Sequence, residues 1–571
     1  MRIKTCVLVA LVAALVAPLP RFHHDNGAIF GALGELSPKM QLTFVLCLRG
    51  TLVTALAVLY SSIPMLLALW YYRQIPGPTP LPLLGNLISI RKHSYHKLVE
   101  RWGKQYGPVF KIFFGSGPVL VISDLELTRE IGLRRFSDFM NHSRHSPEVL
   151  AVLPDPMRAV GTKSILRSRG NYWKGLRSTA ASVFRDSEKL STFQPLMHAT
   201  ATELADRLAD VKEGEFVDIL EAFQDMTLDV IGSTVFGIRF NCVRNKSSDV
   251  VKAARSTFRN SGVKMLGRNP YMLALLASPS LSPLVTRLAK AFPTQSMKEG
   301  AWASNVLGGL SDKLFDEASE EGNRNSATAE APCGVEYEHI GESFLKLFIK
   351  AHNRETGNGL SRDEVTAQAL VLLLGGYDTT SITLAVSVYL LSKNKDKEEE
   401  MIKEIDRLAD TDITSLDDIQ EYKYVEAVVK EALRMNGPLG LTDRVATNTV
   451  DVKGIGTIYK DTPVHIPFRN MHYDPKYFPN PEDFLPERFL PNTDMYGKQN
   501  HKAFMPWGLG PRMCVAYNFS LAEAKLALIT LYRRFRFSLN PNFQLRTAMD
   551  TTISPVDGIP VLVHKRVANK A

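Results

Sequence analysis

Cysteine is scarce in this chain of 571 residues, and its few cysteines are scattered along the whole length: Cys6, Cys47, Cys242, Cys333 and Cys514. Because no two of them form a C-x-x-C pair, neither a disulfide framework nor a structural zinc site is expected. Their odd number leaves at least one thiol unpaired, and so few cysteines favour a reducing compartment for the folded part.

A strong excess of charge of one sign is also missing. Lysine and arginine number 68 against 59 aspartates and glutamates, which gives a net charge of +9. This mild excess does not indicate nucleic-acid binding, and it fits an anionic lipid surface or an acidic protein partner equally well. With 45% apolar and 22% charged residues, the composition excludes a disordered chain, a collagen-like fibre and a polytopic transporter.

Two apolar stretches lie near the amino terminus. The first, residues 6–20, follows Arg2 and Lys4 and has the charged start and short apolar core of a secretory signal peptide. An upstream extension of the gene model is the alternative, because Met40 opens a shorter chain that soon reaches the second stretch.

The second stretch, residues 51–72, carries no charge and is long enough to cross a bilayer as a helix kinked at Pro64, although a buried core helix is the alternative. Trp70, Tyr71 and Tyr72 would lie at one membrane interface. The Pro- and Gly-rich residues that follow are typical of a stiff linker. The predicted organisation is a leader or gene-model extension at 1–39, a membrane anchor at 40–72, a hinge at 73–86 and one large domain at 87–571.

Helical patterns dominate the large domain. The runs VFKIFF and PVLVIS, separated by 115–117, predict a β-hairpin. Residues 361–392 predict a long helix that begins with a capping box of Ser361 and Glu364. The apolar residues of 255–293 have only basic charged neighbours, which fits either core helices or a surface that dips into lipid.

The strongest chemical signal is the stretch 504–526. Gly508 and Gly510 predict a tight loop, and Cys514 follows at the start of an apolar helical pattern. A thiol at a helix start sees aligned backbone N–H groups, which favour the thiolate. The glycines let backbone approach a flat cofactor, and Arg512 could meet an anionic group at its edge. The alternative is a buried structural cysteine in an ordinary turn.

This stretch resembles the haem-binding loop of the cytochrome P-450 family, Phe-x-x-Gly-x-Arg-x-Cys-x-Gly. Here the pattern stands as Trp507, Gly510, Arg512, Cys514 and Ala516, with an aromatic and a small residue replacing the family's Phe and second Gly. The resemblance implies a mainly α fold with small β-sheets, the cytochrome P-450 fold. It also implies haem b with the Cys514 thiolate as axial ligand, and a haem-thiolate catalytic domain at 87–571.

A second family motif is structural. Glu431 and Arg434 share one helix face, and the stretch Pro486-Glu487-Arg488-Phe489 follows. The resemblance implies that Glu431 and Arg434 are buried and lock to Arg488, holding the haem-loop side of the fold.

A third motif lies inside the predicted helix 361–392, where Gly375 and Gly376 precede Asp378 and Thr379. Two glycines inside a helix cost about 1 kcal/mol each against alanine, and close helix packing is the ordinary explanation. The resemblance instead implies a local opening in which Asp378 and Thr379 deliver protons during dioxygen activation.

A fourth set of residues concerns the haem propionates. Trp173 and Arg177 match the family's Trp-x-x-x-Arg helix, and Arg444 lies where the family places another propionate ligand. With Arg512, these side chains are implied to hold the cofactor's acidic groups.

The resemblance implies a membrane-bound monooxygenase that inserts one atom of O2 into a hydrophobic small molecule, either a lipid or a terpenoid- or carotenoid-derived compound. Its electrons would come from NADPH through a cytochrome reductase. A single-pass anchor would hold the enzyme in the endoplasmic reticulum membrane, with the domain facing the cytosol. Four cations are candidates for docking an acidic reductase: Lys174, Arg185, Lys502 and Lys525.

Within the family, Glu-Leu-x-Arg-Glu-Ile-Gly at 126–132 and Leu-Tyr-Arg-Arg at 531–534 are similar to the clan that contains thromboxane synthase and plant carlactone oxidases. Two other functions therefore compete: a thiolate-haem isomerase or dehydratase that acts on peroxides without O2 or reductase, and a non-catalytic haem sensor or membrane scaffold. The intact pair Asp378 and Thr379 favours the monooxygenase, because neither alternative needs a proton relay.

Overall fold

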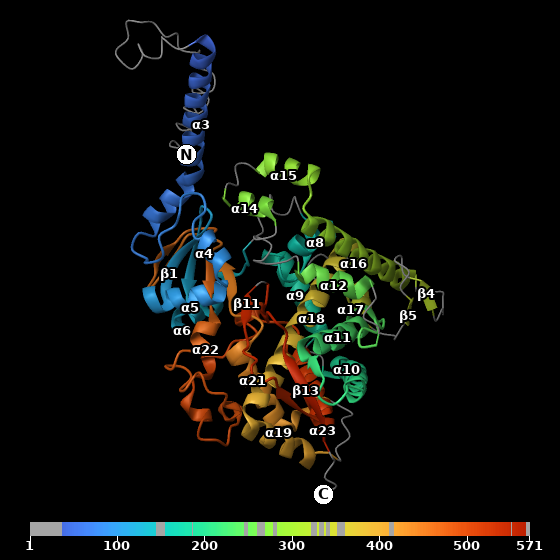
Figure 1. Cartoon of the computed structure of the whole chain (residues 1–571). Coiled ribbons are helices and arrows are strands. Elements are labelled where there is room, and N and C mark those ends of the chain that lie inside the picture. Colours follow the sequence, from blue (N-terminus) through green and yellow to red (C-terminus); the bar gives the residue numbers. More distant parts are fainter. Residues whose placement is uncertain are drawn as a thin grey trace.

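The computed structural model describes residues 37–143, 153, 155–184, 187–244, 249–259, 269–277, 282–320, 328–330, 336–338, 343–350, 360–409, 416–549 and 551–566. The described part is mostly helical with small β-sheets, so the predicted fold class is confirmed. The predicted leader, with its apolar core at 6–20, lies outside the described residues. Figure 1 shows one long helix, α3, projecting from the body, with α14 and α15 toward the same end.

Helix α18 (Arg362–Lys393) forms the centre of the core, and the helix predicted at 361–392 is confirmed. Its capping box is present, since the Ser361 N–H donates to Glu364 Oε2 at 2.7 Å. Helices that pack closely against it include α8 (Asp155–Lys163), α11 (Ile219–Ile231), α16 (Gln295–Glu320) and α21 (Lys423–Asn436). Almost every residue from Val365 to Leu391 is buried, which explains a uniformly apolar helix without an outer face.

Further helices complete the α-helical part of the fold. They are α4 (Leu87–Lys92), α5 (Tyr95–Tyr106), α6 (Leu125–Arg129), α9 (Gly170–Phe184), α10 (Ser187–Ala209), α12 (Asp249–Arg259), α14 (Pro270–Ala277), α15 (Ser282–Ala291), α17 (Phe344–Lys350), α19 (Lys395–Arg407), α20 (Leu416–Gln420), α22 (Phe468–His472) and α23 (Tyr517–Arg534). Helix α23 begins directly after the cysteine loop and lies against α10, α18 and α21.

The largest sheet has four strands in the order β1 (Val109–Phe114), β2 (Gly117–Ile122), β9 (Pro463–Ile466) and β6 (Thr442–Val445). Strands β1 and β2 pair antiparallel, so the predicted hairpin is confirmed, and β9 joins β2 in parallel. A second sheet contains β10 (Phe535–Leu539), β13 (Pro560–Lys565) and β3 (Phe216–Asp218). Two-stranded pairs are β11 (Thr547–Met549) with β12 (Ile553–Pro555), β7 (Val450–Val452) with β8 (Gly456–Ile458), and β4 (Thr328–Glu330) with β5 (Glu336–Glu338).

Helix α3 (Pro38–Tyr71) runs without a break through Pro64. Its last turns lie against the hairpin, where Met65 and Ala68 are buried with Phe113. Its first turns expose apolar side chains such as Leu46 and Leu48. Residues Leu42–Tyr71 are long and apolar enough to cross a membrane; α18 also meets that test but is largely buried in the core.

The Pro- and Gly-rich segment predicted as a hinge is fastened to the four-stranded sheet. The Lys111 backbone N–H donates to the Pro76 carbonyl at 2.8 Å, and Lys111 Nζ donates to the carbonyls of Tyr72, at 2.8 Å, and Ile75. Burial lowers the pKa of Lys111. The Tyr72 hydroxyl bonds to Thr462 Oγ1 at 2.7 Å. The foot of α3 is therefore attached directly to the domain.

Candidate active site

The cysteine loop adopts a backbone that only glycine tolerates at its tightest point. Gly508 and Gly510 have φ angles of 82° and 68°. A Cβ on Gly510 would lie 2.3 Å from the Gly132 carbonyl oxygen, and one on Gly132 would lie 2.5 Å from the Leu509 side chain. The loop thus packs directly on the π-helical turn η1 (Glu130–Arg134). This turn overlaps the end of the stretch 126–132, whose sequence is similar to the clan named above.

Cys514 is both accessible and closely surrounded. Its side chain is exposed to water-sized molecules although protein surrounds it closely. Desolvation raises the pKa of this thiol, while the Ala516 N–H and the positive charge of Arg177 lower it. Burial therefore opposes the local N–H group and the nearby cation, which both favour the thiolate as expected for a thiol at a helix start. A bound metal cation would reverse that balance.

Trp507 stabilises the cysteine loop through a backbone hydrogen bond and through contacts of its ring. Its carbonyl accepts the Cys514 N–H at 2.9 Å, and its ring contacts Phe504 and Tyr517 edge-on, with centroids 6.1 and 6.2 Å apart. The residues after the thiol, Val515 and Ala516, pack on the core cluster that includes Leu370 and Val371 of α18. The end of the cysteine loop and the middle of α18 therefore contribute to the same hydrophobic cluster.

A cluster of cations lies beside this loop. Arg512 donates to the carbonyls of Met140, Ile165 and Ser168 at 2.9, 3.2 and 2.7 Å. Its guanidinium also lies 3.9 Å from the centre of the Trp173 ring. Burial lowers the pKa of Arg512 to about 9, with further contributions from the positive charges of Arg444 and Arg177.

Arg444 is fully buried and bonded to the same loop, since its Nη2 donates to the Leu509 carbonyl at 3.1 Å. Among the described residues its Nε has no hydrogen-bond partner. Burial lowers the pKa of Arg444 to about 10, although the charge of Asp443 opposes the shift. Several desolvated cations, one with an unpaired donor, make this position favourable for an anionic group.

The predicted structural lock, formed by Glu431, Arg434 and Arg488, is buried. Glu431 accepts two hydrogen bonds from Arg434, both 2.7 Å long, and one from Arg488 Nε at 3.2 Å. All three side chains have no exposed area. Arg434 also donates to the His472 carbonyl at 2.9 Å, so the lock joins α21 to the segment that leads to the cysteine loop.

The two glycines of α18 differ in what surrounds them. A Cβ on Gly376 would lie 2.2 Å from Ile231 Cδ1, so this glycine serves close helix packing. A Cβ on Gly375 would meet nothing within 4 Å, and Gly375 is exposed within an otherwise buried helix. Thr379 Oγ1 donates to the Gly375 carbonyl at 2.5 Å. The turn from Gly375 to Thr379 therefore borders an opening.

Asp378 points into a polar contact that the sequence did not predict. Its Oδ2 accepts a hydrogen bond from Thr552 Oγ1, in the turn between β11 and β12, and Gln224 Nε2 of α11 lies 3.5 Å from Oδ1. Asp378 and Thr552 are each 6% exposed. No local signal in the sequence marks Thr552 or Gln224, because both partners are more than 150 residues away from Asp378.

The candidate docking cations differ in their exposure to solvent. Lys174 and Lys502 are exposed. Lys525 is not available to a partner, because its side chain is 3% exposed and pairs with Glu426 at 2.9 Å. The prediction that Lys525 docks the reductase is wrong, because this position of α23 faces α21. Arg185 lies outside the described residues.

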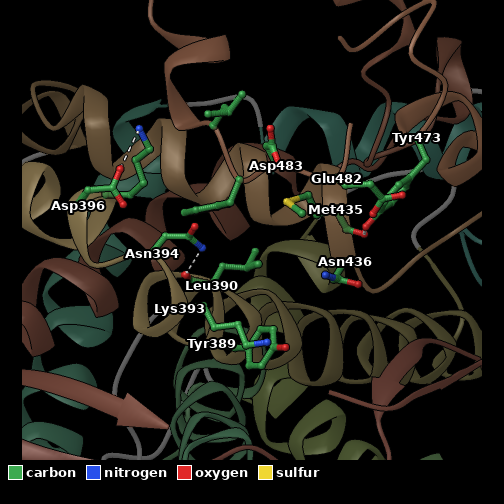
Figure 2. A pocket seen from close by; sticks show the side chains of 13 residues that line it. Tyr389, Leu390, Lys393, Asn394, Asp396, Met435, Asn436, Tyr473, Glu482 and Asp483 are labelled. Carbon is green, nitrogen blue, oxygen red and sulfur yellow. Dashed lines mark hydrogen bonds and ion pairs between the residues drawn. The ribbon is translucent and has the colours of Figure 1, made fainter. Parts of the chain in front are cut away.

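A surface cleft of about 520 Å³ has none of the predicted site residues in its lining. Figure 2 shows its mixed lining, with Lys393 and Asp396 on one side and Glu482 and Asp483 on the other. Its lining is polar and of both charges, unlike the apolar pocket expected for a hydrophobic substrate.

Comparisons with known proteins agree with this geometry. The family model described as Cytochrome P450 matches residues 75–560. The chain is 29% identical over 510 residues to cytochrome P450 3A6 of Oryctolagus cuniculus, covering 88% of this chain and 93% of that protein. It is 29% identical over 512 residues to cytochrome P450 3A31 of Mesocricetus auratus, with 88% and 93% covered. It is 26% identical over 534 residues to CYP13A7 of Caenorhabditis elegans, with 88% and 97% covered.

Proposed function

We propose that Cys514 supplies the thiolate ligand of the haem in this chain, which belongs to the cytochrome P450 family of haem-thiolate monooxygenases. The observation that carries this proposal is the position of Cys514, closely surrounded by protein yet open to small molecules, beside a cluster of desolvated arginines. A haem fits these residues, because its iron would stabilise the thiolate and its acidic groups would neutralise the cations.

Arg444, Arg512, Trp173 and Arg177 would hold the propionate side of the haem. Arg444 has an unpaired buried donor to offer, and Arg512 is fixed by three carbonyls and the ring of Trp173. Gly510 would let the loop backbone approach the cofactor closely, because no side chain intervenes there. When bound, the haem supplies the iron chemistry that activates dioxygen.

Asp378 and Thr379 would carry protons at this site. Thr379 Oγ1 donates to the Gly375 carbonyl. Rotation of the hydroxyl can redirect its proton toward the open space bordered by Gly375. Asp378 can replace the proton through water, which makes the two side chains a relay. This relay is needed for dioxygen activation and supports the monooxygenase over a peroxide isomerase.

A hydrophobic small molecule is the proposed substrate, either a lipid or a compound derived from terpenoids or carotenoids. Val556, in the turn after β12, is 53% exposed, and Leu439, after α21, is 41% exposed. Both residues flank the contact between Ile553 and Pro438, next to the turn that carries Thr552, and exposed apolar side chains there favour an apolar ligand.

We also propose single-pass anchoring in the endoplasmic reticulum membrane, with the domain in the cytosol. The exposed apolar turns of α3 support this, as do Leu284, Leu288 and Phe292 on and after α15, which are 56%, 42% and 70% exposed. Helix α14 touches the hairpin turn near the foot of α3, because a Cβ on Gly115 would lie 2.0 Å from the Leu276 carbonyl oxygen. Electrons would come from NADPH through a reductase that docks on cations such as Lys174 and Lys502.

The reduced, carbon-monoxide-bound absorption spectrum tests the ligand. The wild-type protein should give the red-shifted Soret band of a thiolate ligand, and Cys514→Ala should lose it. Cys47→Ala is the matched control, because Cys47 is an exposed cysteine of α3 and should leave the band unchanged. A folded, haem-loaded Cys514→Ala protein that keeps the band would overturn the assignment.

A further inference from the structure

We propose that Thr552 is a positioning residue for proton delivery: its hydroxyl holds the carboxylate of Asp378 and so links the β11–β12 turn to the relay on α18. The inference rests on the proposed function, because it assigns a partner to the acid of that relay.

The contact itself is buried and charge-assisted. Thr552 Oγ1 donates to Asp378 Oδ2, and both side chains are 6% exposed. The amide of Gln224 lies 3.5 Å from the other carboxylate oxygen, at the limit of hydrogen bonding. A hydroxyl that donates to a carboxylate away from water makes a stronger bond than one between neutral groups. Of the two side chains, Thr552 makes the shorter contact with the Asp378 carboxylate. It therefore fixes the direction in which this carboxylate points.

Thr552 is in turn held in place by elements other than α18. The next residue, Ile553, donates its N–H to the Pro438 carbonyl at 2.7 Å and pairs with Met549 across the hairpin. The Ile553 side chain packs on Gly440, where a Cβ would lie 2.6 Å from Ile553 Cδ1. The hydroxyl thus occupies a position set by the hairpin and by the segment after α21.

The opposite side of the same helical turn is fixed as well. Thr227 Oγ1 of α11 donates to the Tyr377 carbonyl at 2.9 Å, one residue before Asp378. The backbone is therefore held from α11 and the carboxylate from the hairpin, while Thr379 faces the opening. A relay needs its acid within hydrogen-bonding reach of the alcohol or of one bridging water. Without the Thr552 hydroxyl, the carboxylate loses its hydrogen bond to the hairpin and keeps the longer contact with Gln224.

Three variants test this role. Thr552→Val keeps the shape and removes the hydroxyl, Thr552→Ser restores a hydroxyl, and Ser554→Ala removes a hydroxyl from the adjacent strand β12 as a matched control. With any oxidised substrate and a reductase, Thr552→Val should lower the product formed per NADPH by about tenfold and release hydrogen peroxide instead. Thr552→Ser and Ser554→Ala should remain close to wild type. Wild-type coupling in Thr552→Val would overturn the proposal.

A second measurement does not depend on activity. Denaturant unfolding of Thr552→Val, Asp378→Asn and the double variant should be non-additive, because each single change breaks the same contact. Additive effects would contradict the contact. If Thr552→Val does not fold, Thr552→Ala takes its place in both measurements. The carbon-monoxide spectrum separates the two proposals: a wild-type protein without the thiolate band defeats the proposed function, whereas the unfolding cycle still decides on Thr552.

Discussion

Gly510 and Gly132 approach each other so closely that a Cβ on Gly510 would lie 2.3 Å from the Gly132 carbonyl oxygen. The cysteine loop and the turn η1 are thus fitted together, although 378 residues separate the two glycines in the sequence. The left-handed backbone of Gly510, with φ of 68°, adds a second reason why no side chain fits there. The position of Cys514 depends on this contact.

Gly510→Ala should therefore impair haem loading. We expect destabilisation by more than about 1 kcal/mol, because the substitution combines a steric clash with an unfavourable φ angle. The ratio of Soret to protein absorbance and the midpoint of denaturant unfolding measure the effect. Gly497→Ala is the control, since nothing lies within 4 Å of its Cβ position, and equal behaviour of the two variants would contradict the contact.

The sequence predicted best what is encoded locally. The capping box of Ser361 and Glu364 and the hairpin 109–122 depend on neighbouring residues, and both are confirmed. The pattern around Cys514 spans ten residues, so its loop could be recognised without the fold.

Contacts between distant segments could not be predicted. Lys525 follows a helical pattern that gives no sign that Glu426 covers it, and Thr552 lies 174 residues after Asp378. The Pro- and Gly-rich stretch 73–86 is typical of a linker, yet the buried side chain of Lys111 fastens it to the sheet. In each case the partner is chosen by tertiary packing, which one segment of sequence does not contain.

The buried lock predicts a large cost for removing its only acid. Glu431→Gln would leave Arg434 and Arg488 as neighbouring cations without exposed area. We expect a loss of about 3–5 kcal/mol in the free energy of unfolding, measured by denaturant titration. Glu400→Gln, which breaks an exposed pair with Lys403, should cost less than about 1 kcal/mol. Similar costs for both variants would show that the lock contributes no more than a surface pair.

Protonation of the buried His472 should lower the stability of the protein in acid. Its Nε2 accepts the Met505 N–H at 3.2 Å, which requires a neutral ring, and burial lowers its pKa to about 3 from 6.5. Between these values the unfolded state binds a proton more readily, so stability is fully present above pH 6.5 and falls as the pH approaches 3.

The measurement compares thermal unfolding at pH 7 and pH 4.5 in wild type and His472→Gln. The variant should lose less stability on acidification, because each pKa unit corresponds to about 1.4 kcal/mol of linkage. His501→Gln replaces an exposed histidine and should keep the wild-type difference. An unchanged pH dependence in His472→Gln would rule out this histidine as a source of acid sensitivity.

Charge reversal should distinguish surface from buried lysines. Lys174→Glu and Lys502→Glu should slow turnover supported by a reductase several-fold, most strongly at low salt, and leave turnover with cumene hydroperoxide unchanged. Lys525→Glu should instead lower stability, because it would place a carboxylate against Glu426. If reductase-supported turnover is unaffected in the first two variants, docking occurs on another face.

Replacing Thr379 by Ala separates the candidate activities. In a monooxygenase the loss of this hydroxyl interrupts proton delivery, so consumption of NADPH should continue while product falls by about tenfold or more and hydrogen peroxide accumulates. An isomerase acting on peroxides would be nearly indifferent, since it draws no protons from the relay. Thr379→Ser is the matched control, because it retains a hydroxyl that can donate to the Gly375 carbonyl or to the opening. Equal coupling in the two variants, together with turnover of a peroxide in the absence of reductase, would favour the isomerase and would remove the function assigned to Asp378 and Thr379.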